Sequence, residues 1–351
     1  MTPKISQQAT KNKRGEVLFR RKLVKQHQGQ NVFFPTHTTA SQNMKLLKER
    51  MEQTVETFLP LIERKIARSP FLEIGAEKCE RAIAVMKEYH LTGFSLDISL
   101  ESLASADRLV KPLGYTKLPI RLSADAYNLP FANDSLPFVF IYQTLHHFPD
   151  PFPILKEVYR VLRPGGYLFF SEEPIKQKVN LNLWKRDWRL TPLEKILKAI
   201  LILPFLAGVG KSEVEHDVLE EAFELSVWER TLNTFDEVEA SIRPTFVGPK
   251  IKRQRNGTVG WLTPDIFTHG LIHLQGGGVT ALCRKTSKGG SQKNHPDLLT
   301  LLECPECHKG SLNKQKRHLV CPSCSTAFPY IKNVYLVMKK EQQEELYGDL
   351  L

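Results

Sequence analysis

Long apolar runs are missing from this chain of 351 residues. The mostly apolar stretch from Ile196 to Val209 has only about 14 residues, whereas a helix that crosses a bilayer needs roughly 20. The region from Met1 to Gln30 is polar and rich in Lys and Arg, so it lacks the apolar centre of a secretory signal. These absences argue against a membrane-spanning or secreted protein and predict a cytoplasmic one.

Cysteine is also scarce, with six residues in the whole chain. This small number argues against a disulfide framework, and nothing else in the sequence indicates an oxidising compartment. Four of the six form two Cys-Pro-x-Cys pairs separated by thirteen residues: Cys304, Cys307, Cys321 and Cys324. This spacing is typical of a zinc ribbon, since each tight turn places two thiolates at two corners of a tetrahedron. Four sulfur ligands leave no open position, so the sequence predicts a structural Zn²⁺.

Glycine is scarce where a nucleotide-binding loop would need it. The apolar run Phe71–Ile74 ends at Gly75, and the following residues, Ala76 to Cys79, contain no second glycine. Nicotinamide dehydrogenases need a three-glycine fingerprint to hold a pyrophosphate at this position, so the sequence argues against that class. One glycine still allows the backbone to approach a ligand closely.

Short apolar runs alternate with helical patterns between Phe71 and Phe170, which predicts a parallel sheet with helices on both faces. The second run ends at Asp97, where open α/β sheets place the carboxylate that binds ribose hydroxyls. Asp125 follows a third run and is a candidate acceptor for an exocyclic amine such as adenine N6. The order of these residues therefore indicates a nucleotide-type pocket.

Two neighbouring histidines follow the fourth apolar run, Phe138–Tyr142, at the expected rim of the pocket. A neutral imidazole there could remove a proton from a hydroxyl, so His146 and His147 are candidate catalytic bases. The alternative is that one ring packs and the other only shapes the pocket. A Pro-Gly-Gly turn at 164–166 then precedes a fifth run.

Together, these residues resemble the class I S-adenosylmethionine-dependent methyltransferases over Leu72 to Glu173. The resemblance implies a Rossmann-like, doubly wound α/β fold with a mostly parallel seven-stranded sheet and S-adenosyl-L-methionine as the cofactor. The first loop of the family usually has three glycines, so Glu77 and Cys79 are expected to narrow the approach to the methionine end of the cofactor. The predicted cofactor contacts are Glu73, Gly75, Asp97, Asp125, Ala126 and Gln143.

The segment from Leu301 to Ile331 resembles the small zinc-ribbon family of methyltransferase activators, whose members bind and stabilise methyltransferases of RNA and protein substrates. The resemblance implies a ribbon that is fused to its partner and docks on it. A helix is predicted over Met44–Phe58, with Pro60 ending or kinking it, and Val279–Cys283 is the expected last strand of the sheet. The predicted domain map is a basic flexible arm (1–40), a methyltransferase domain (41–285) with a lid or substrate insertion (174–245), a linker (286–298) and the zinc ribbon (299–340).

The insertion is expected to select the substrate, because segments above the carboxyl edge of such a sheet form the pocket walls. Trp184–Arg189 mixes aromatic with basic residues, and Ile196–Val209 is mostly apolar with lysines around it. The region 184–211 is therefore a candidate peripheral membrane contact that gives access to a lipid-linked substrate. A lid or core helix is the alternative, and Glu213–Asp217 is a further candidate pocket segment.

The leading hypothesis is a methyltransferase that acts on a small or lipid-linked metabolite. The sulfonium of the cofactor already activates the methyl group, so the protein mainly has to align the acceptor. The absence of an Asn-Pro-Pro-Tyr motif after the fourth run disfavours methylation of base amino groups. An RNA methyltransferase remains open, because the net charge is +11 and basic residues cluster at Lys250–Arg255 and near Lys314 and Arg317. A non-catalytic protein on the same fold is the third hypothesis, because the first loop keeps a single glycine.

Overall fold

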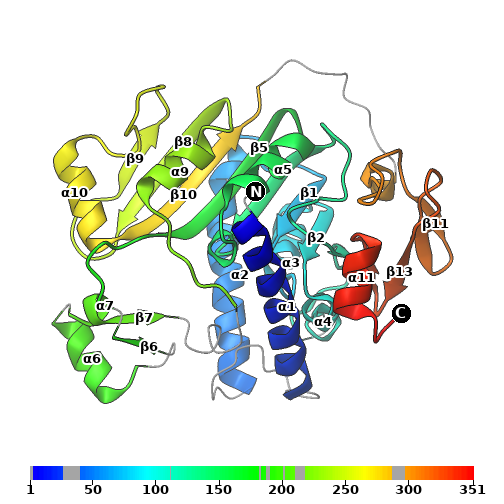
Figure 1. Cartoon of the computed structure of the whole chain (residues 1–351), viewed down its shortest axis with the longest axis horizontal. Coiled ribbons are helices and arrows are strands. Elements are labelled where there is room, and N and C mark those ends of the chain that lie inside the picture. The colour runs from blue at the N-terminus through cyan, green and yellow to red at the C-terminus, as the bar shows by residue number, and fades with distance from the viewer. Residues whose placement is uncertain are drawn as a thin grey trace.

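The computed structural model describes residues 3–26, 40–110, 112–181, 183–186, 190–200, 202–209, 218–286 and 297–351. Its centre is one mixed sheet of twelve strands in the order β11-β12-β13-β14-β3-β2-β1-β4-β5-β10-β8-β9 (Figure 1). A separate small sheet pairs β6 (Trp184–Arg186) with β7 (Ala207–Val209). The strands of the main sheet are β1 (Phe71–Ile74), β2 (Gly93–Asp97), β3 (Ile120–Ser123), β4 (Leu136–Tyr142), β5 (Leu162–Ile175), β8 (Glu237–Pro244), β9 (Ile251–Gln254), β10 (Gly277–Arg284), β11 (Asn313–Gln315), β12 (His318–Val320), β13 (Ala327–Ile331) and β14 (Val334–Leu336).

The strands β3, β2, β1, β4 and β5 form the parallel centre that the sequence predicts. Phe71 pairs with Gly93 on one side and with Phe138 on the other, so β1 is a central strand. Every residue of β1 and β2 is buried, as expected for strands that are covered on both faces. Because these strands are parallel, their carboxyl ends meet at one edge of the sheet.

The prediction of seven mostly parallel strands is wrong at both ends of the sheet. β10 contains the expected last strand, Val279–Cys283, and is antiparallel to both β5 and β8. At the other end, β14 pairs in parallel with β3, where Tyr335 lies opposite Leu122. The strands of the C-terminal region therefore extend the methyltransferase sheet instead of forming a separate unit. Such a pairing joins residues far apart in the sequence, so no local pattern predicts it.

Helices cover the two faces of the sheet. Phe58 of α2 packs edge-on against Phe138 and Phe140, with 5.8 and 5.1 Å between ring centroids. The predicted helix before the first strand is present, but it continues past Pro60 to Glu63. The helices are α1 (Pro3–Gln26), α2 (Ala40–Glu63), α3 (Glu80–Tyr89), α4 (Leu100–Ser105), α5 (Phe152–Val161), α6 (Pro192–Ala199), α7 (Leu203–Leu206), α9 (Leu225–Leu232), α10 (Ile266–Gln275) and α11 (Lys340–Tyr347), with short 3-10 turns at Ala106–Arg108, Leu145–His147 and Leu298–Leu301.

The first part of the predicted flexible arm is instead the packed helix α1. Ala9, Val17 and Phe19 are buried, and Arg21 binds Glu101 of α4 at 2.7 Å. α1 and α2 run alongside each other in Figure 1 and contribute to one hydrophobic cluster. The prediction failed because the segment is mostly polar, and the few apolar residues that anchor it are spread thinly. The rest of the predicted arm, 27–39, lies outside the described residues.

The first part of the predicted insertion, 174–245, forms a small lobe of β6, β7, α6 and α7 that lies below α10 in Figure 1. The last part does not belong to a lid, because α9 packs into the main core and β8 pairs with β10 in the main sheet. The continuous helix considered for Ile196–Val209 is not formed, because the segment is divided among the end of α6, the short α7 and β7. Phe205 of the lobe stacks on Phe246, with 5.4 Å between ring centroids. None of the described helices combines the length and the apolar character needed to cross a bilayer. The predictions for Glu213–Asp217 and for the linker segment 287–296 lie outside the described residues.

Candidate functional site

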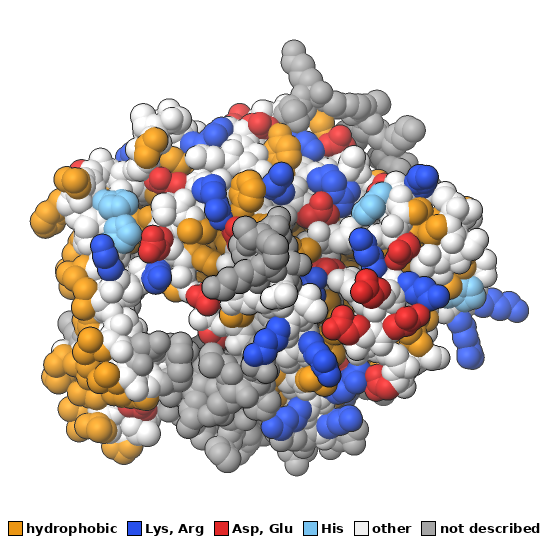
Figure 2. All heavy atoms as spheres, in the orientation of Figure 1, with side chains coloured by type: hydrophobic (Ala, Val, Ile, Leu, Met, Phe, Trp, Pro, Cys, Tyr) orange, Lys and Arg blue, Asp and Glu red, His pale blue; other side chains and the backbone are white. Residues whose placement is uncertain are grey.

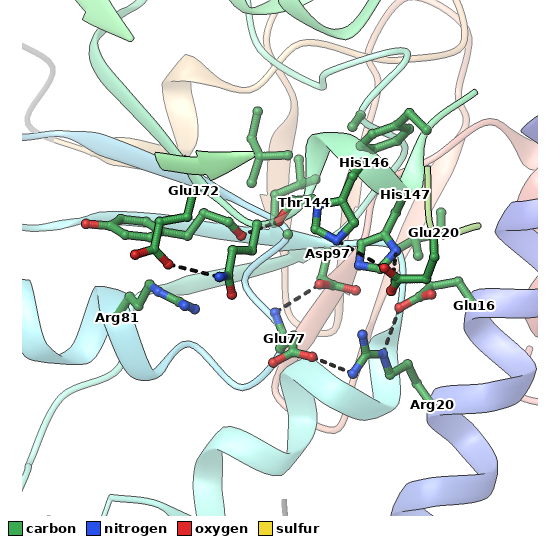
Figure 3. Close-up of a pocket in the computed structure, with 18 of the residues that line it drawn as sticks. Glu16, Arg20, Glu77, Arg81, Asp97, Thr144, His146, His147, Glu172 and Glu220 are labelled. Carbon is green, nitrogen blue, oxygen red and sulfur yellow. Dashed lines mark hydrogen bonds and ion pairs between the residues drawn. The ribbon is translucent and has the colours of Figure 1, made fainter. Parts of the chain in front are cut away.

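A cavity of about 670 Å³ lies at the carboxyl ends of β1, β2, β3 and β4, closed on one side by α1 and α2 (Figure 3). Its volume is in the range of pockets for small ligands and cofactors. Seven of the predicted site residues line this one cavity: Gly75, Asp97, Asp125, Ala126, Gln143, His146 and His147. The structure therefore brings together most of the residues that the sequence singled out.

Glu73 is the predicted contact that the structure does not bring to the cavity. Its side chain is buried and accepts a hydrogen bond from Ser95 Oγ at 2.9 Å. The cavity is lined instead by Ile74 and Gly75, because successive side chains of a strand point to opposite faces of the sheet. Burial raises the pKa of Glu73 to about 8.

The loop after β1 adopts a glycine-type backbone with one glycine. Gly75 has a φ of +73°, and a Cβ there would lie 2.2 Å from Thr144 Oγ1. Glu77 and Cys79, which stand where the methyltransferase family usually has glycines, also have positive φ, at 42° and 62°. Only glycine adopts this region without steric cost, so the backbone of the loop is strained at Glu77 and Cys79.

Asp97, at the end of β2, presents its carboxylate to the cavity. Its two carboxylate oxygens accept the backbone N–H groups of Ser99 at 2.8 Å and Glu77 at 2.9 Å. A carboxylate offers about four lone-pair positions, so two acceptor positions remain for a pair of hydroxyls. Burial raises the pKa of Asp97 to about 6. This donor and acceptor set fits the ribose of S-adenosylmethionine.

Asp125 is already engaged by two distant parts of the chain. Its Oδ2 accepts hydrogen bonds from Lys13 of α1 at 2.5 Å and from Gln342 of α11 at 2.7 Å, and its Oδ1 accepts the N–H of Tyr127 at 3.0 Å. The carboxylate thus ties both helices to the loop after β3. The neighbouring Ala126 lines the cavity as predicted.

The residues of α1 are the part of the site that the sequence did not reveal. Asn12, Lys13, Glu16 and Arg20 all line the cavity. Arg20 bonds to Glu16 at 2.7 Å and also to Glu77 of the glycine-type loop (Figure 3). Burial raises the pKa of Glu77, but the positive charges of Arg20, Lys78, Arg50 and Arg81 together outweigh burial, so the pKa lies well below its usual value. The ion pair of Arg20 with Glu77 thus holds α1 across the cavity, against the loop after β1.

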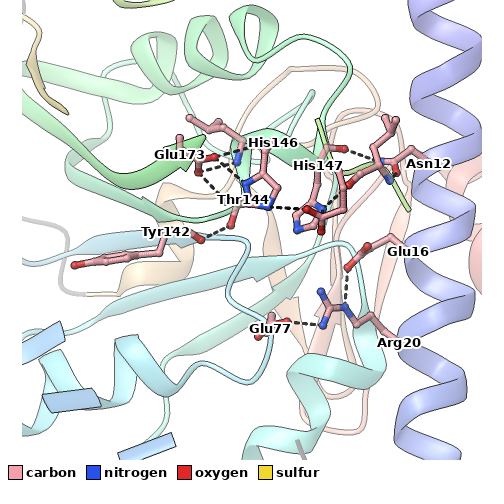
Figure 4. A network of polar contacts seen from close by, with 12 residues as sticks. Asn12, Glu16, Arg20, Glu77, Tyr142, Thr144, His146, His147 and Glu173 are labelled. Carbon is pink, nitrogen blue, oxygen red and sulfur yellow. Dashed lines mark hydrogen bonds and ion pairs between the residues drawn. The ribbon is translucent and has the colours of Figure 1, made fainter. Parts of the chain in front are cut away.

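Glu173 of β5 positions the first of the two histidines. This carboxylate is fully buried and accepts the backbone N–H groups of Thr144, Leu145 and His146 at 2.7, 2.9 and 3.1 Å. His146 Nδ1 lies 2.9 Å from the same carboxylate (Figure 4). Burial opposes ionisation of Glu173, yet these hydrogen bonds lower its pKa. The sequence analysis passed over Glu173, because its role depends on the pairing of β4 with β5.

The hydrogen-bond partners define which imidazole nitrogens are basic. His147 Nδ1 lies 2.8 Å from the carbonyl oxygen of Leu219, which can only accept, so Nδ1 carries the proton. The ionised Glu173 imposes the same tautomer on His146, which leaves Nε2 unprotonated when the ring is neutral. His146 Nε2 lies 3.7 Å from a carboxylate oxygen of Glu220 at the cavity wall. His146, His147 and Glu220 also bring potential metal-ligand atoms within 4.8 Å of one another.

The four predicted zinc ligands converge. Cys304 Sγ lies 3.7 Å from Cys324 Sγ, and Cys307 Sγ lies 3.6 Å from Cys321 Sγ. A tetrahedral zinc ion with Zn–S bonds of about 2.3 Å would require sulfurs about 3.8 Å apart, so the four thiols fit the metal. The first cysteine turn also contacts the cavity region, because Asn128 donates to the carbonyl oxygen of Pro305 at 2.8 Å.

Residues 72–170 match the family model described as a methyltransferase domain. The match covers the strands whose carboxyl ends form the cavity. The fold, the cavity and this match together define a methyltransferase domain in this part of the chain.

Individual relatives share parts of the chain. It is 42% identical over 77 residues to a demethylmenaquinone methyltransferase of Bacillus velezensis, covering 22% of this chain and 33% of that protein. It is 30% identical over 152 residues to a 27-O-demethylrifamycin SV methyltransferase of Amycolatopsis mediterranei, covering 43% of this chain and 54% of that protein. Among solved structures, magnesium protoporphyrin IX methyltransferase from Synechocystis PCC 6803 is similar over 76% of this chain and 94% of that chain, with 11% identity and a TM-score of 0.42. The chain spans about a third to a half of the length of these two curated relatives.

Proposed function

We propose that the chain is an S-adenosylmethionine-dependent methyltransferase that acts on a hydroxyl group of a small or lipid-linked metabolite. One observation supports this proposal most strongly. The same cavity contains Asp97, a carboxylate with free acceptor positions, and His146, an imidazole that the buried carboxylate of Glu173 orients. The first suits a ribose and the second suits removal of a proton from an acceptor hydroxyl. When bound, the cofactor would supply an electrophilic methyl group on a sulfonium.

In this proposal the chain holds the cofactor through the loops after β1, β2 and β3. Gly75 allows close approach of the backbone, Asp97 accepts the ribose hydroxyls, and Ala126 borders the adenine. His146 takes the proton of the acceptor at Nε2, while Glu173 stabilises the imidazolium through Nδ1. Positioned general bases of this kind typically contribute a factor of about 10²–10⁴ in rate. His147 lies beside this base and helps to shape the acceptor site.

The acceptor is proposed to be largely apolar. Phe19, Leu46, Ile98 and Phe148 contribute apolar surface to the cavity in addition to the charged groups. Two of the similar proteins are named for demethylmenaquinone and for 27-O-demethylrifamycin SV. By analogy, we place an acceptor of this general kind in the part of the cavity next to His146.

The zinc ribbon is proposed to stabilise the adenine side of the pocket. Asn128 in the loop after β3 bonds to Pro305 of the ribbon, and Gln342 of α11 bonds to Asp125. A Zn²⁺ held by four thiolates would stabilise the ribbon and, through it, these contacts with the loop after β3. Thiolate ligands agree with the predicted reducing, cytoplasmic location.

Calorimetric titration of the zinc-loaded protein with S-adenosylmethionine tests the proposal, with Asp97→Ala as the matched variant. Micromolar binding that the variant loses is the expected result, because the ribose acid would then carry part of the affinity. If the intact protein binds no cofactor, the strained loop at Gly75 has lost the site, and the hypothesis of a non-catalytic protein replaces this one.

RNA methylation is the second candidate, favoured by one observation. The hairpin of β11 and β12 carries Lys314, Lys316 and Arg317, and all three side chains are exposed. Clustered basic residues neutralise phosphates, so this function predicts RNA binding that weakens steeply with salt. A gel-shift series at increasing salt with Lys314→Ala/Lys316→Ala as the control decides between the two candidates.

A further inference from the structure

Helix α6 has its apolar side turned towards solvent. Leu193, Ile196 and Ile200 recur at helical spacing and are 63, 60 and 55% exposed. Its start is a well-formed capping box, in which Thr191 and Glu194 satisfy each other's backbone N–H groups. Glu194, the acidic residue of the helix, is buried. An ordinary surface helix buries its apolar stripe, whereas α6 exposes apolar side chains together with Lys195 and Lys198.

A second group of exposed apolar side chains lies on α10. Ile266 and Phe267 at its start are 90 and 81% exposed. The backbone N–H of Lys178 donates to the carbonyl oxygen of His273 at 2.8 Å, and Phe205 stacks on Phe246, so the lobe is fastened to this side of the sheet. Figure 2 shows hydrophobic side chains gathered along the edge of the molecule occupied by α10 and the lobe. We call this surface, made of Leu193, Ile196, Ile200, Ile266 and Phe267, the apolar edge.

Positive charge accompanies the apolar edge. Lys176, Lys178, Lys195 and Lys198 are all exposed. Among the described residues of 176–209, the one acidic residue is Glu194, whose carboxylate accepts hydrogen bonds from Thr191 and from Trp184 Nε1. Exposed apolar side chains next to lysines are typical of a helix that lies in a membrane interface. In such a helix the apolar side chains and the lysine stems reach the acyl boundary, and the ammonium groups stay at the headgroups.

We propose that the apolar edge docks the protein on the surface of a lipid bilayer that contains anionic lipids. A bilayer supplies apolar depth for Ile196 and Phe267, and anionic headgroups supply negative charge opposite the exposed Lys178, Lys195 and Lys198. A second copy of the chain would bring the same lysines face to face, so like charges oppose that occupant. Pro174 near the end of β5 lines the cavity, and the chain continues from β5 to β6 of the lobe, so the docking surface is joined to the cavity wall by a short segment.

Flotation of the full-length protein with phosphatidylcholine vesicles, with and without phosphatidylglycerol, tests the proposal. The wild-type protein is expected to float with the vesicles and to bind more strongly when phosphatidylglycerol is present. Ile196→Asp/Ile200→Asp should weaken binding at least about tenfold, because charged groups replace the inserted apolar side chains. Leu351→Asp is the matched control, because Leu351 is 58% exposed and lies at the C-terminus on the opposite side of the molecule (Figure 1).

A second variant tests the electrostatic half of the proposal. Lys195→Glu/Lys198→Glu leaves the apolar side chains in place and should remove most of the preference for phosphatidylglycerol, about fivefold or more. Unchanged cofactor binding by each variant serves as the check of folding. The proposal is overturned if the wild-type protein binds neither kind of vesicle or if both variants bind like the wild type. It is also overturned if size-exclusion chromatography shows a wild-type dimer that the Asp variant converts to a monomer without any vesicle binding.

Discussion

Gly75 and Thr144 leave no space for a side chain between them: a Cβ at Gly75 would lie 2.2 Å from Thr144 Oγ1. The residue also has a φ of +73°, which an L side chain rarely adopts. Steric crowding and backbone conformation therefore act together at this position. The single glycine that remains in the loop is the one for which no substitute fits.

Gly75→Ala is expected to lower the free energy of unfolding by roughly 2–4 kcal/mol, from backbone strain and from the clash with Thr144. Gly165 is a matched control, because its φ is +74° and a Cβ at this position would meet no described heavy atom within 4 Å. Gly165→Ala should cost only about 1 kcal/mol, for the backbone alone. Urea denaturation of the two variants measures the difference. Equal losses would show that the contact with Thr144 relaxes freely.

Removal of the proposed base should reduce the rate of methyl transfer without changing the affinity for the cofactor. His146→Asn is expected to lower the rate of methyl transfer about 10²–10³-fold, and Glu173→Gln to lower it by a smaller factor, because the ring then loses its orienting carboxylate. His147→Asn should change the rate less than about tenfold. The assay is transfer of labelled methyl from the cofactor to a lipid extract, with the affinity for the cofactor measured in parallel.

The pH profile separates a base from a residue that only shapes the pocket. If His146 takes the proton of the acceptor, the pH dependence of the rate should have a different shape in His146→Asn and in the wild type. If the variant keeps the same pH dependence at a lower rate, His146 only shapes the acceptor site and another group takes the proton.

Glu73 should make the protein less stable at alkaline pH. Burial raises its pKa to about 8 in the folded state, whereas glutamate in an unfolded chain titrates at about 4.3. The folded state therefore holds the proton more tightly, and the stability that this provides is complete below a pH of about 4.3 and is lost as the pH rises towards 8. Glu73→Gln cannot ionise and should be more stable than the wild type at a pH of about 8.5 by roughly 2–4 kcal/mol.

Thermal or urea unfolding of Glu73→Gln at two pH values checks this sign. Near a pH of about 4.5 the wild-type carboxyl is already protonated in the folded state, so the two proteins should have nearly the same stability. A gain of equal size at both pH values would mean that packing against Ser95, and not ionisation, separates them.

Loss of zinc should weaken cofactor binding. The ribbon contacts the loop after β3 through Pro305 and Asn128, and α11 contacts the same loop through Gln342 and Asp125, which lines the cavity. Cys304→Ser/Cys307→Ser is therefore expected to weaken the affinity for S-adenosylmethionine about tenfold or more, because the loop after β3 loses its support. Cys283→Ser is the control, since this buried thiol lies in β10, away from the four ligands.

Gln342→Ala tests the direct contact without disturbing the metal. Loss of a hydrogen bond to a charged group is worth about 1.5–3 kcal/mol at most, so a several-fold weaker affinity with full zinc content is expected. Unchanged affinity in both the cysteine and the glutamine variants would separate the ribbon from cofactor binding altogether.

Local sequence patterns were sufficient to predict the parallel centre of the fold and most of the predicted residues that line the cavity. Gly75, Asp97 and His146 each follow an apolar run, and parallel strands necessarily bring their carboxyl ends to the same edge. The spacing of the two Cys-Pro-x-Cys pairs is typical of a zinc site, so the convergence of the four cysteines could also be predicted from the sequence. These residues were predictable because each has a chemical identity and a fixed position relative to a strand.

The parts that were missed depend on contacts between distant segments. Because α1 is mostly polar, it has no apolar periodicity from which its packing could be predicted. The positions of Lys13 and Arg20 at the cavity were therefore missed. Glu73 was misplaced because a strand end gives the position of a residue but not the face to which its side chain points. Glu173 was passed over because its role appears only when the ends of β4 and β5 lie side by side, which puts His146 within 2.9 Å of it.

The pairing of β14 with β3 has a consequence for the order in which the chain can fold. Ile120–Ser123 is made long before Val334–Leu336, so during synthesis the open side of β3 exposes unpaired backbone groups of the kind that promote aggregation. The partner strand β14 follows the last zinc ligand, Cys324, and pairs with the intervening β13, so a ribbon that has not bound its metal would present β14 poorly. Zinc supply during translation should therefore govern the yield of native protein, through protection of a sheet edge that lies about 200 residues upstream of the metal.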